Sequence, residues 1–187
     1  MRVVAGSVRG FNLIVPSGKN TRPTTNRIKE TLFNILQWDI AGCRFLDLFS
    51  GSGGIAIEAL SRGAKEAVMV EKDREAVRCI KQNVQHTKMD DRSRVMPMDV
   101  MQALRRLEQA GQPFDIIFMD PPYGKGLEFQ VLEALQGTTL VDEDTQIIIE
   151  ESLDVTWERA EELGYEIIKV KKYKTNQHVF LKKRGEL

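Results

Sequence analysis

Hydrophobic residues in this chain form short continuous runs, and segments with helical spacing separate these runs. The runs predict buried strands, one beginning at Phe45 and the others at residues 67–71, 93–98, 113–119 and 146–150. Apolar residues spaced three and four apart predict a helix after each of these strands, and another before the first, ending near Trp38. Strands that alternate with helices predict an α/β fold with a mostly parallel sheet and helices on both faces.

The two ends of the chain depart from this alternation. Two β-rich runs within residues 165–182 predict an antiparallel hairpin, so at least one strand of the sheet must run against the others. Two short runs within residues 3–15, separated by glycines, predict a small N-terminal β-hairpin arm. We therefore divide the chain into an arm, 1–20, and a single globular domain, 21–187.

One stretch, residues 45–60, has the sequence form of a strand, a tight turn and a helix start, FLDLFSGSGGIAIEAL. Gly51 and Gly53 can adopt positive φ and lack a Cβ, so a ligand can approach their backbone N–H groups closely. The N-terminus of the following helix adds further donors for a negatively charged group. Gly51-x-Gly53-x-x-Ala56, with Glu71 about 20 residues later, also fits the dinucleotide fingerprint, which leaves an NAD enzyme open.

Four carboxylates lie at or just past the ends of predicted strands: Asp47, Glu71, Asp99 and Asp120. In open α/β sheets the ligand crevice lies outside the carboxyl ends of the strands, so these side chains should converge there. Asp99 is placed to accept a hydrogen bond from an adenine amino group. Acids at strand ends also occur as helix caps, but four in corresponding positions favour a binding site.

The sequence Asp120-Pro121-Pro122-Tyr123 follows the fourth strand. Consecutive prolines fix φ and remove two N–H donors, which leaves rigidly placed carbonyl acceptors. The Asp120 carboxylate and the Pro121 carbonyl can accept the two N–H bonds of an exocyclic amine, and Tyr123 offers a face on which a base can stack. This combination predicts chemistry on the amino group of a base, whereas a sharp loop with a capping Asp is the structural alternative.

Charge is unevenly distributed, although the net charge is zero. Every charged residue before Glu30 is basic, acids gather between residues 150 and 166, and a second basic group occupies residues 169–184. A basic N-terminal segment suits a phosphate backbone, and a solvated surface is the alternative.

Composition limits the other classes of protein. No apolar run approaches the ~20 residues that span a bilayer, and the N-terminus lacks the apolar region of a signal peptide. Cys43 and Cys79 are isolated and have no nearby His, which argues against a metal site and favours reduced cysteines. We therefore expect a cytoplasmic protein with no membrane association and no bound metal.

Together the motifs resemble S-adenosylmethionine-dependent amino-group methyltransferases. The whole chain resembles more closely the RsmD type, which methylates the N2 amine of one guanosine in small-subunit (16S) ribosomal RNA. Two N-terminal signatures carry that narrower resemblance, AGSVRG at 5–10 and RPTTNRIKETLFN at 22–34. One departure is visible at Lys174, where the family pattern leads us to expect glycine after Tyr173.

The resemblance implies a Rossmann-like class I methyltransferase fold with a seven-stranded sheet, S-adenosyl-L-methionine as cofactor, and a set of site residues. The cofactor would be held by residues of the glycine turn and of the next two strand ends: Asp47, Phe49, Ser50, Gly51, Gly53, Glu71, Lys72, Asp99 and Val100. Within this set the turn would hold the methionine part, Glu71 the ribose and Asp99 the adenine. The target base would be oriented and stacked by Asp120, Pro121, Pro122 and Tyr123.

The implied partner is ribosomal RNA or an assembling small ribosomal subunit, and a monomer is the default expectation. Candidate phosphate contacts lie in the arm and in the turn before the first helix: Arg2, Arg9, Arg22, Thr24, Asn26 and Arg27. The residues of that turn can equally cap the helix and pack on the core.

Two other functions remain open from the sequence. An N6-adenine DNA methyltransferase would use Asp-Pro-Pro-Tyr equally well, although the chain leaves no room for a separate DNA-recognition domain. A non-catalytic RNA-binding assembly factor would predict a damaged motif, whereas all four strand-end acids are present. An NAD dehydrogenase lacks an evident catalytic partner, because neither His86 nor His178 falls at a predicted strand end.

Overall fold

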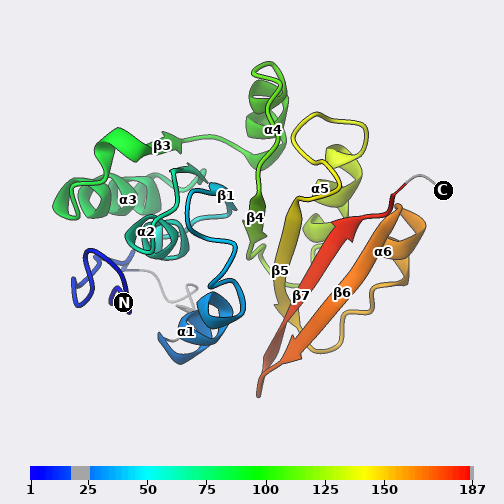
Figure 1. Cartoon of the computed structure of the whole chain (residues 1–187), viewed down its shortest axis with the longest axis horizontal. Coiled ribbons are helices and arrows are strands. Elements are labelled where there is room, and N and C mark those ends of the chain that lie inside the picture. Colours follow the sequence, from blue (N-terminus) through cyan, green and yellow to red (C-terminus); the bar gives the residue numbers. More distant parts are fainter. Residues whose placement is uncertain (18–25, 186–187) are drawn as a thin grey trace.

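The computed structural model describes residues 1–17 and 26–185, which are built around one seven-stranded sheet (Figure 1). The strands lie in the order β3-β2-β1-β4-β5-β7-β6. Their bounds are β1 Arg44–Leu48, β2 Glu66–Val70, β3 Ser93–Met96, β4 Ile116–Met119, β5 Gln146–Ser152, β6 Tyr165–Lys172 and β7 Asn176–Lys183. Strands β1 to β5 are parallel, and β7 runs antiparallel to β5 and β6. The predicted α/β fold with a C-terminal antiparallel hairpin is therefore confirmed.

Helices cover both faces of the sheet. Their bounds are α1 Asn26–Ile35, α2 Gly54–Ser61, α3 Arg74–His86, α4 Val100–Glu108, α5 Leu127–Leu135 and α6 Glu158–Glu162, with a 3-10 turn, η1, at Asp90–Arg92. Helices α1, α2 and α3 pack on one face, and α4, α5 and α6 pack on the other.

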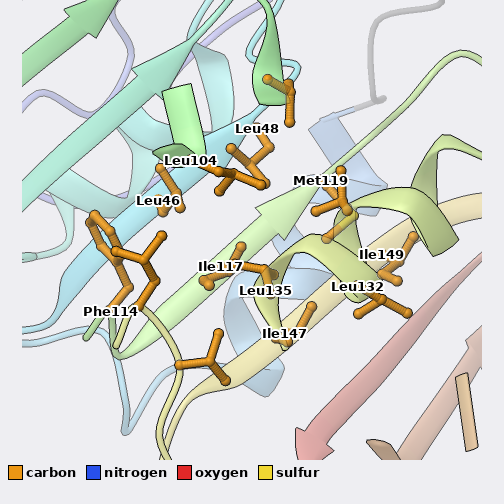
Figure 2. Packing of buried hydrophobic residues seen from close by; sticks show 14 of the residues in the cluster. Leu46, Leu48, Leu104, Phe114, Ile117, Met119, Leu132, Leu135, Ile147 and Ile149 are labelled. Atoms are coloured by element: carbon orange, nitrogen blue, oxygen red, sulfur yellow. The ribbon is translucent and has the colours of Figure 1, made fainter. Parts of the chain in front are cut away.

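The core forms two layers because alternate residues of a strand point to opposite faces. Figure 2 shows one layer, in which Leu46, Ile117 and Ile147 of three neighbouring strands lie near Leu104 and Leu135 of α4 and α5. The intervening residues form the other layer with α1 to α3. The central strands are buried on both faces, which explains their continuous apolar runs.

The parallel strands all end at one edge of the sheet. The tip of the β6–β7 hairpin lies at this edge too, because Asn176 at the start of β7 pairs with Ser152 at the end of β5. The loops that carry the predicted site residues therefore gather with the hairpin tip on one side of the molecule.

The N-terminal arm differs from the prediction in detail. Its two runs meet at one antiparallel bridge, Arg2 with Asn12, and form no regular strands. Gly6 and Gly10 turn the chain with φ of 87° and 90°. Much of the arm's backbone hydrogen bonding goes to the domain, because side chains of α2 and α3 accept its N–H groups. The arm is consequently packed onto α2 and α3, and its Val3 is fully buried.

Glu58 of α2 is the main anchor of the arm. Its carboxylate accepts the backbone N–H groups of Val4 and Ala5 at 2.8 and 2.9 Å. It also pairs with Lys29 of α1 at 2.9 Å and with Arg62 at 2.9 Å. The Lys29 ammonium donates in addition to the carbonyl of Arg2. The side chains of Lys29 and Glu58 are fully buried, so one charged cluster joins α1, α2 and the arm.

Helix α1 is shorter than predicted. It ends at Ile35, and Trp38 lies beyond it with 87% of its surface exposed. None of the helices within the described ranges is both long enough and apolar enough to span a membrane.

Candidate active site

A pocket of about 580 Å³ opens at the carboxyl ends of the parallel strands. Its walls come from the loops after β1, β2, β3 and β4, from β5 and β7, and from the N-terminal arm. Of the residues predicted to hold a cofactor, all except Gly53 line it: Asp47, Phe49, Ser50, Gly51, Glu71, Lys72, Asp99 and Val100. All four residues predicted to position the base line it as well: Asp120, Pro121, Pro122 and Tyr123.

The glycine turn after β1 forms one wall of this pocket. Phe49, Gly51 and Gly53 all have positive φ, at 64°, 55° and 77°. A Cβ on Gly51 would meet nothing within 4 Å, so its backbone is open to a ligand. Gly53 has a different role, because its Cα faces Met69 and Ile80 and a Cβ there would lie 3.1 Å from the Met69 sulfur. It shapes the turn from behind the pocket.

Asp47 lies near the end of β1, just before the glycine turn, and is almost fully buried. One of its carboxylate oxygens, Oδ2, has no hydrogen-bond partner among the described residues. Burial raises the pKa of Asp47 to about 8, the Ala56 backbone N–H opposes the shift, and the charge of Glu71 adds to it. A buried carboxylate with an unused acceptor favours a ligand that brings a positive charge or an N–H or O–H donor.

Glu71 and Asp99 are both held by backbone donors. Glu71 accepts the N–H groups of Gly51, Lys72 and Asp73 at 2.8 to 2.9 Å, which fixes its carboxylate between the β1 and β2 loops. Asp99 caps α4 by accepting the N–H of Met101 at 2.9 Å. The capping role expected as the structural alternative is therefore real for Asp99, and it coexists with a place in the pocket wall.

Asp120 leaves β4 beside the pocket and is partly buried. Burial raises its pKa well above the ordinary value, and the negative charges of Glu150, Asp47 and Glu151 raise it further. Pro121 is buried, whereas Tyr123 is 41% exposed at the rim. The motif thus offers acceptors inside the pocket and an aromatic ring at its mouth.

The predicted RNA-contacting residues that the structure describes lie outside the pocket. Arg2, Arg9, Asn26 and Arg27 are exposed, and none lines it. Their neighbours do, because Met1, Val15, Pro16 and Ile28 form part of the wall. Arg22 and Thr24 lie outside the described residues. The arm and the start of α1 therefore border the pocket.

Among the polar residues of the pocket, the sequence analysis did not predict Glu150 of β5 and Asn176 of β7. Glu150 carried a usable signal, since it closes a predicted strand as the other acids do. Asn176 carried none, because its position depends on how the C-terminal hairpin pairs with β5. Within the described ranges no group of His, Cys, Asp and Glu is arranged to hold a metal ion.

Comparisons with known proteins agree with this geometry. The model of the family described as conserved hypothetical protein 95 matches residues 1–182. A putative rRNA methyltransferase, YlbH of Bacillus subtilis, is 36% identical over 155 residues, which cover 83% of this chain and 84% of that protein. The ribosomal RNA small subunit methyltransferase D of Escherichia coli K12 is 35% identical, over 82% of this chain and 76% of that protein. The solved structure of a putative methyltransferase, yhhF from Escherichia coli, has a TM-score of 0.84 and 30% identity, over 100% of this chain and 99% of that one.

Proposed function

The chain belongs to the family described as conserved hypothetical protein 95, which is the RsmD type, and on this basis we propose that it methylates ribosomal RNA with S-adenosylmethionine as methyl donor. We further propose that the acceptor is the N2 amine of one guanosine in small-subunit ribosomal RNA. The observation that carries this function is the shared pocket, in which Asp120 and Pro121 face the same space as the glycine turn, Glu71 and Asp99.

Structural features of the pocket match S-adenosylmethionine, and these features do not depend on the comparisons with known proteins. The unpaired oxygen of Asp47 suits the amino group of a methionine moiety, and the open backbone of Gly51 leaves room for it. Glu71 and Asp99, fixed by backbone donors, would hold the ribose hydroxyls and the adenine amino group. Val100 and the partly buried Met98 supply apolar surface for the adenine ring. When bound, the cofactor supplies a methyl group activated by a sulfonium.

The residues of this chain act by positioning. Asp120 and the Pro121 carbonyl would accept the two N–H bonds of the amine and direct its lone pair across the pocket, while Tyr123 stacks on the base. Holding the reactants in line supplies the main rate gain in such a displacement, so no nucleophilic side chain is needed. The amine nitrogen gains the methyl group and then loses one proton, to the Asp120 carboxylate or to water. A guanine amine inside paired RNA is out of reach, so the base must be extruded or already unpaired.

Radiolabelled methyl transfer from S-adenosylmethionine tests this function. The substrates are small-subunit ribosomal RNA, assembled small subunits and DNA, all from a strain that lacks the protein, with nucleoside analysis of the product. We expect N2-methylguanosine at one ribosomal position. N6-methyladenine in DNA would instead support the alternative methyltransferase. Tight binding of S-adenosylhomocysteine without transfer to any substrate would support a binding factor.

Arg9 is the described arm residue best placed to test RNA contact. It is exposed in the turn between Gly6 and Gly10. We expect Arg9→Ala to weaken RNA binding, because one phosphate contact is lost. The slope of the logarithm of the binding constant against the logarithm of the salt concentration should become shallower by about one. Filter binding over a salt series measures this. Arg159→Ala, an exposed change on α6 across the sheet, is the control and should leave the slope unchanged. An unchanged slope for Arg9→Ala would show that Arg9 makes no phosphate contact with the RNA.

The pH dependence of transfer should report Asp120. Its carboxylate accepts the amine only when deprotonated, and burial together with Glu150 and Asp47 holds its pKa well above the usual 3.8. The single-turnover rate should therefore fall as the pH drops through this raised pKa. Rates at saturating cofactor between about pH 9 and about pH 5 test the expectation. A rate that stays constant over this range would contradict it.

A further inference from the structure

Glu150 and Asp120 are neighbours across two adjacent strands. Met119 of β4 pairs with Ile149 of β5, so the next residues, Asp120 and Glu150, leave that pair side by side. Both side chains line the pocket. On the other side of Glu150 its Cα partner is His178 of β7. Three polar residues thus lie in a row across β4, β5 and β7.

The carboxylate of Glu150 is held in place by its β7 neighbours. Asn176 donates from Nδ2 to Oε1 at 2.7 Å, and His178 Nε2 lies 3.0 Å from Oε2. The other ring nitrogen of His178, Nδ1, is 3.1 Å from the Tyr173 hydroxyl. One pattern of hydrogen bonds uses both ring nitrogens of His178: Tyr173 donates to Nδ1, and Nε2–H donates to the Glu150 carboxylate. His178 is fully buried, so this arrangement is shielded from water.

Asn176 contributes a second acceptor. Its Nδ2 is used by Glu150, and its buried Oδ1 has no hydrogen-bond partner among the residues described. Asn176 is only 4% exposed and lines the pocket. This end of the pocket therefore presents Asp120, the Pro121 carbonyl, Glu150 and Asn176 Oδ1, which are all acceptors. A ligand that fits here must bring several donors side by side.

The edge of guanine that carries the N2 amine has this property. Its N1–H and its amine are adjacent donors, whereas adenine places the lone pair of N1 beside its amine. A donor edge between Asp120 and Glu150 would also relieve the repulsion of the two carboxylates. An adenine N1 would face a carboxylate and leave it unpaired, and sites built on such hydrogen bonds reject the wrong partner strongly.

We propose that Glu150 selects guanine by accepting its N1–H, next to the amine that Asp120 and Pro121 accept. Asn176 and His178 position the Glu150 carboxylate for this contact, and Tyr173 sets the tautomer of His178. The inference rests on the proposed function and adds a specificity-determining residue to it.

The test compares RNA that carries guanine at the target position with the same RNA that carries 2-aminopurine there. 2-Aminopurine keeps the 2-amino group and lacks the N1–H. The RNA is a synthetic segment around the guanosine that the wild-type protein methylates, ligated into full-length RNA if assembly is required. Two readouts are taken: equilibrium binding in the presence of S-adenosylhomocysteine, and single-turnover methyl transfer.

We expect the wild-type protein to favour guanine over 2-aminopurine by about 100-fold or more. Glu150→Gln can donate to the unprotonated N1 of 2-aminopurine, so its preference should shrink to within about tenfold. Tyr173→Phe, which keeps the ring and removes only the hydroxyl, should give an intermediate loss of preference. Glu151→Gln is the matched control, because this neighbouring buried carboxylate does not line the pocket, and it should keep the wild-type preference.

The outcomes separate this inference from the proposed function. A wild-type protein that methylates guanine, with a folded Glu150→Gln variant that keeps the full preference, would overturn the role of Glu150 alone. An equal loss of preference in Glu151→Gln would overturn it as well, because the effect would then be one of charge. A wild-type protein that methylates no guanine would overturn the proposed function and this inference with it.

Discussion

Asp120→Ala is expected to reduce methyl transfer by about 1,000-fold or more while cofactor affinity changes by no more than a few-fold. The carboxylate is the acceptor that orients the amine, and a misplaced amine loses both the in-line geometry and the directed lone pair. The residues expected to hold the cofactor, Asp47, Glu71 and Asp99, lie on or directly after other strands and remain intact. The variant also removes one of several carboxylates that repel one another, so the fold should survive.

Isothermal titration with S-adenosylhomocysteine and single-turnover transfer measure the two effects separately. Asp115→Asn is the matched control. Asp115 directly precedes β4, whereas Asp120 directly follows it, and Asp115 accepts the N–H of Arg44 away from the pocket. Its transfer rate should match that of the wild-type protein. Full activity in Asp120→Ala would remove Asp120 from the site, and a parallel loss of cofactor binding would make it a cofactor ligand instead.

The sheet and its helices could be predicted because their signals are local. Consecutive residues are enough to predict the strand from Phe45 and the turn that follows it. Gly51 and Gly53 adopt the positive φ that this turn requires. The convergence of Asp47, Glu71 and Asp120 followed from parallel strands alone. The family resemblance supplied the cofactor and the roles of these acids, which periodicity cannot give.

The parts that the sequence did not predict depend on pairing between distant segments. Glu150 and Asn176 come together only because β7 inserts beside β5 in one register, with Ser152 opposite Asn176. The arm pairs with itself as expected at Arg2 and Asn12, but other N–H groups of the arm donate to Glu58 and Asn83, which are more than 50 residues away. Helical spacing gave no sign that Glu58, on a mostly apolar helix, faces inward to meet Lys29.

Glu58→Gln is expected to destabilise the protein by about 3–5 kcal/mol, because it leaves the Lys29 ammonium buried without its counter-charge. The arm should loosen first, since Glu58 accepts two of its backbone N–H groups. Urea unfolding followed by circular dichroism measures the loss. Glu133→Gln is the control, because its pair with Arg159 is long, at 3.7 Å, and exposed on both sides. It should change stability by less than about 1 kcal/mol.

The same variant links stability to function. Met1, Val15 and Pro16 of the arm form part of the pocket wall, so a loosened arm should weaken binding of S-adenosylhomocysteine even though Glu58 does not line the pocket. Replacing both partners, Lys29→Met with Glu58→Gln, removes the unpaired buried charge of the Lys29 ammonium. The double variant should therefore recover a large part of the lost stability. The double variant still lacks full acceptance of the Val4 and Ala5 N–H groups, so cofactor affinity should recover less than stability does. If the Glu58→Gln variant has the same urea midpoint of unfolding as the wild-type protein, the buried charged cluster contributes little to stability. The arm must then be held by the burial of Val3 and Leu13.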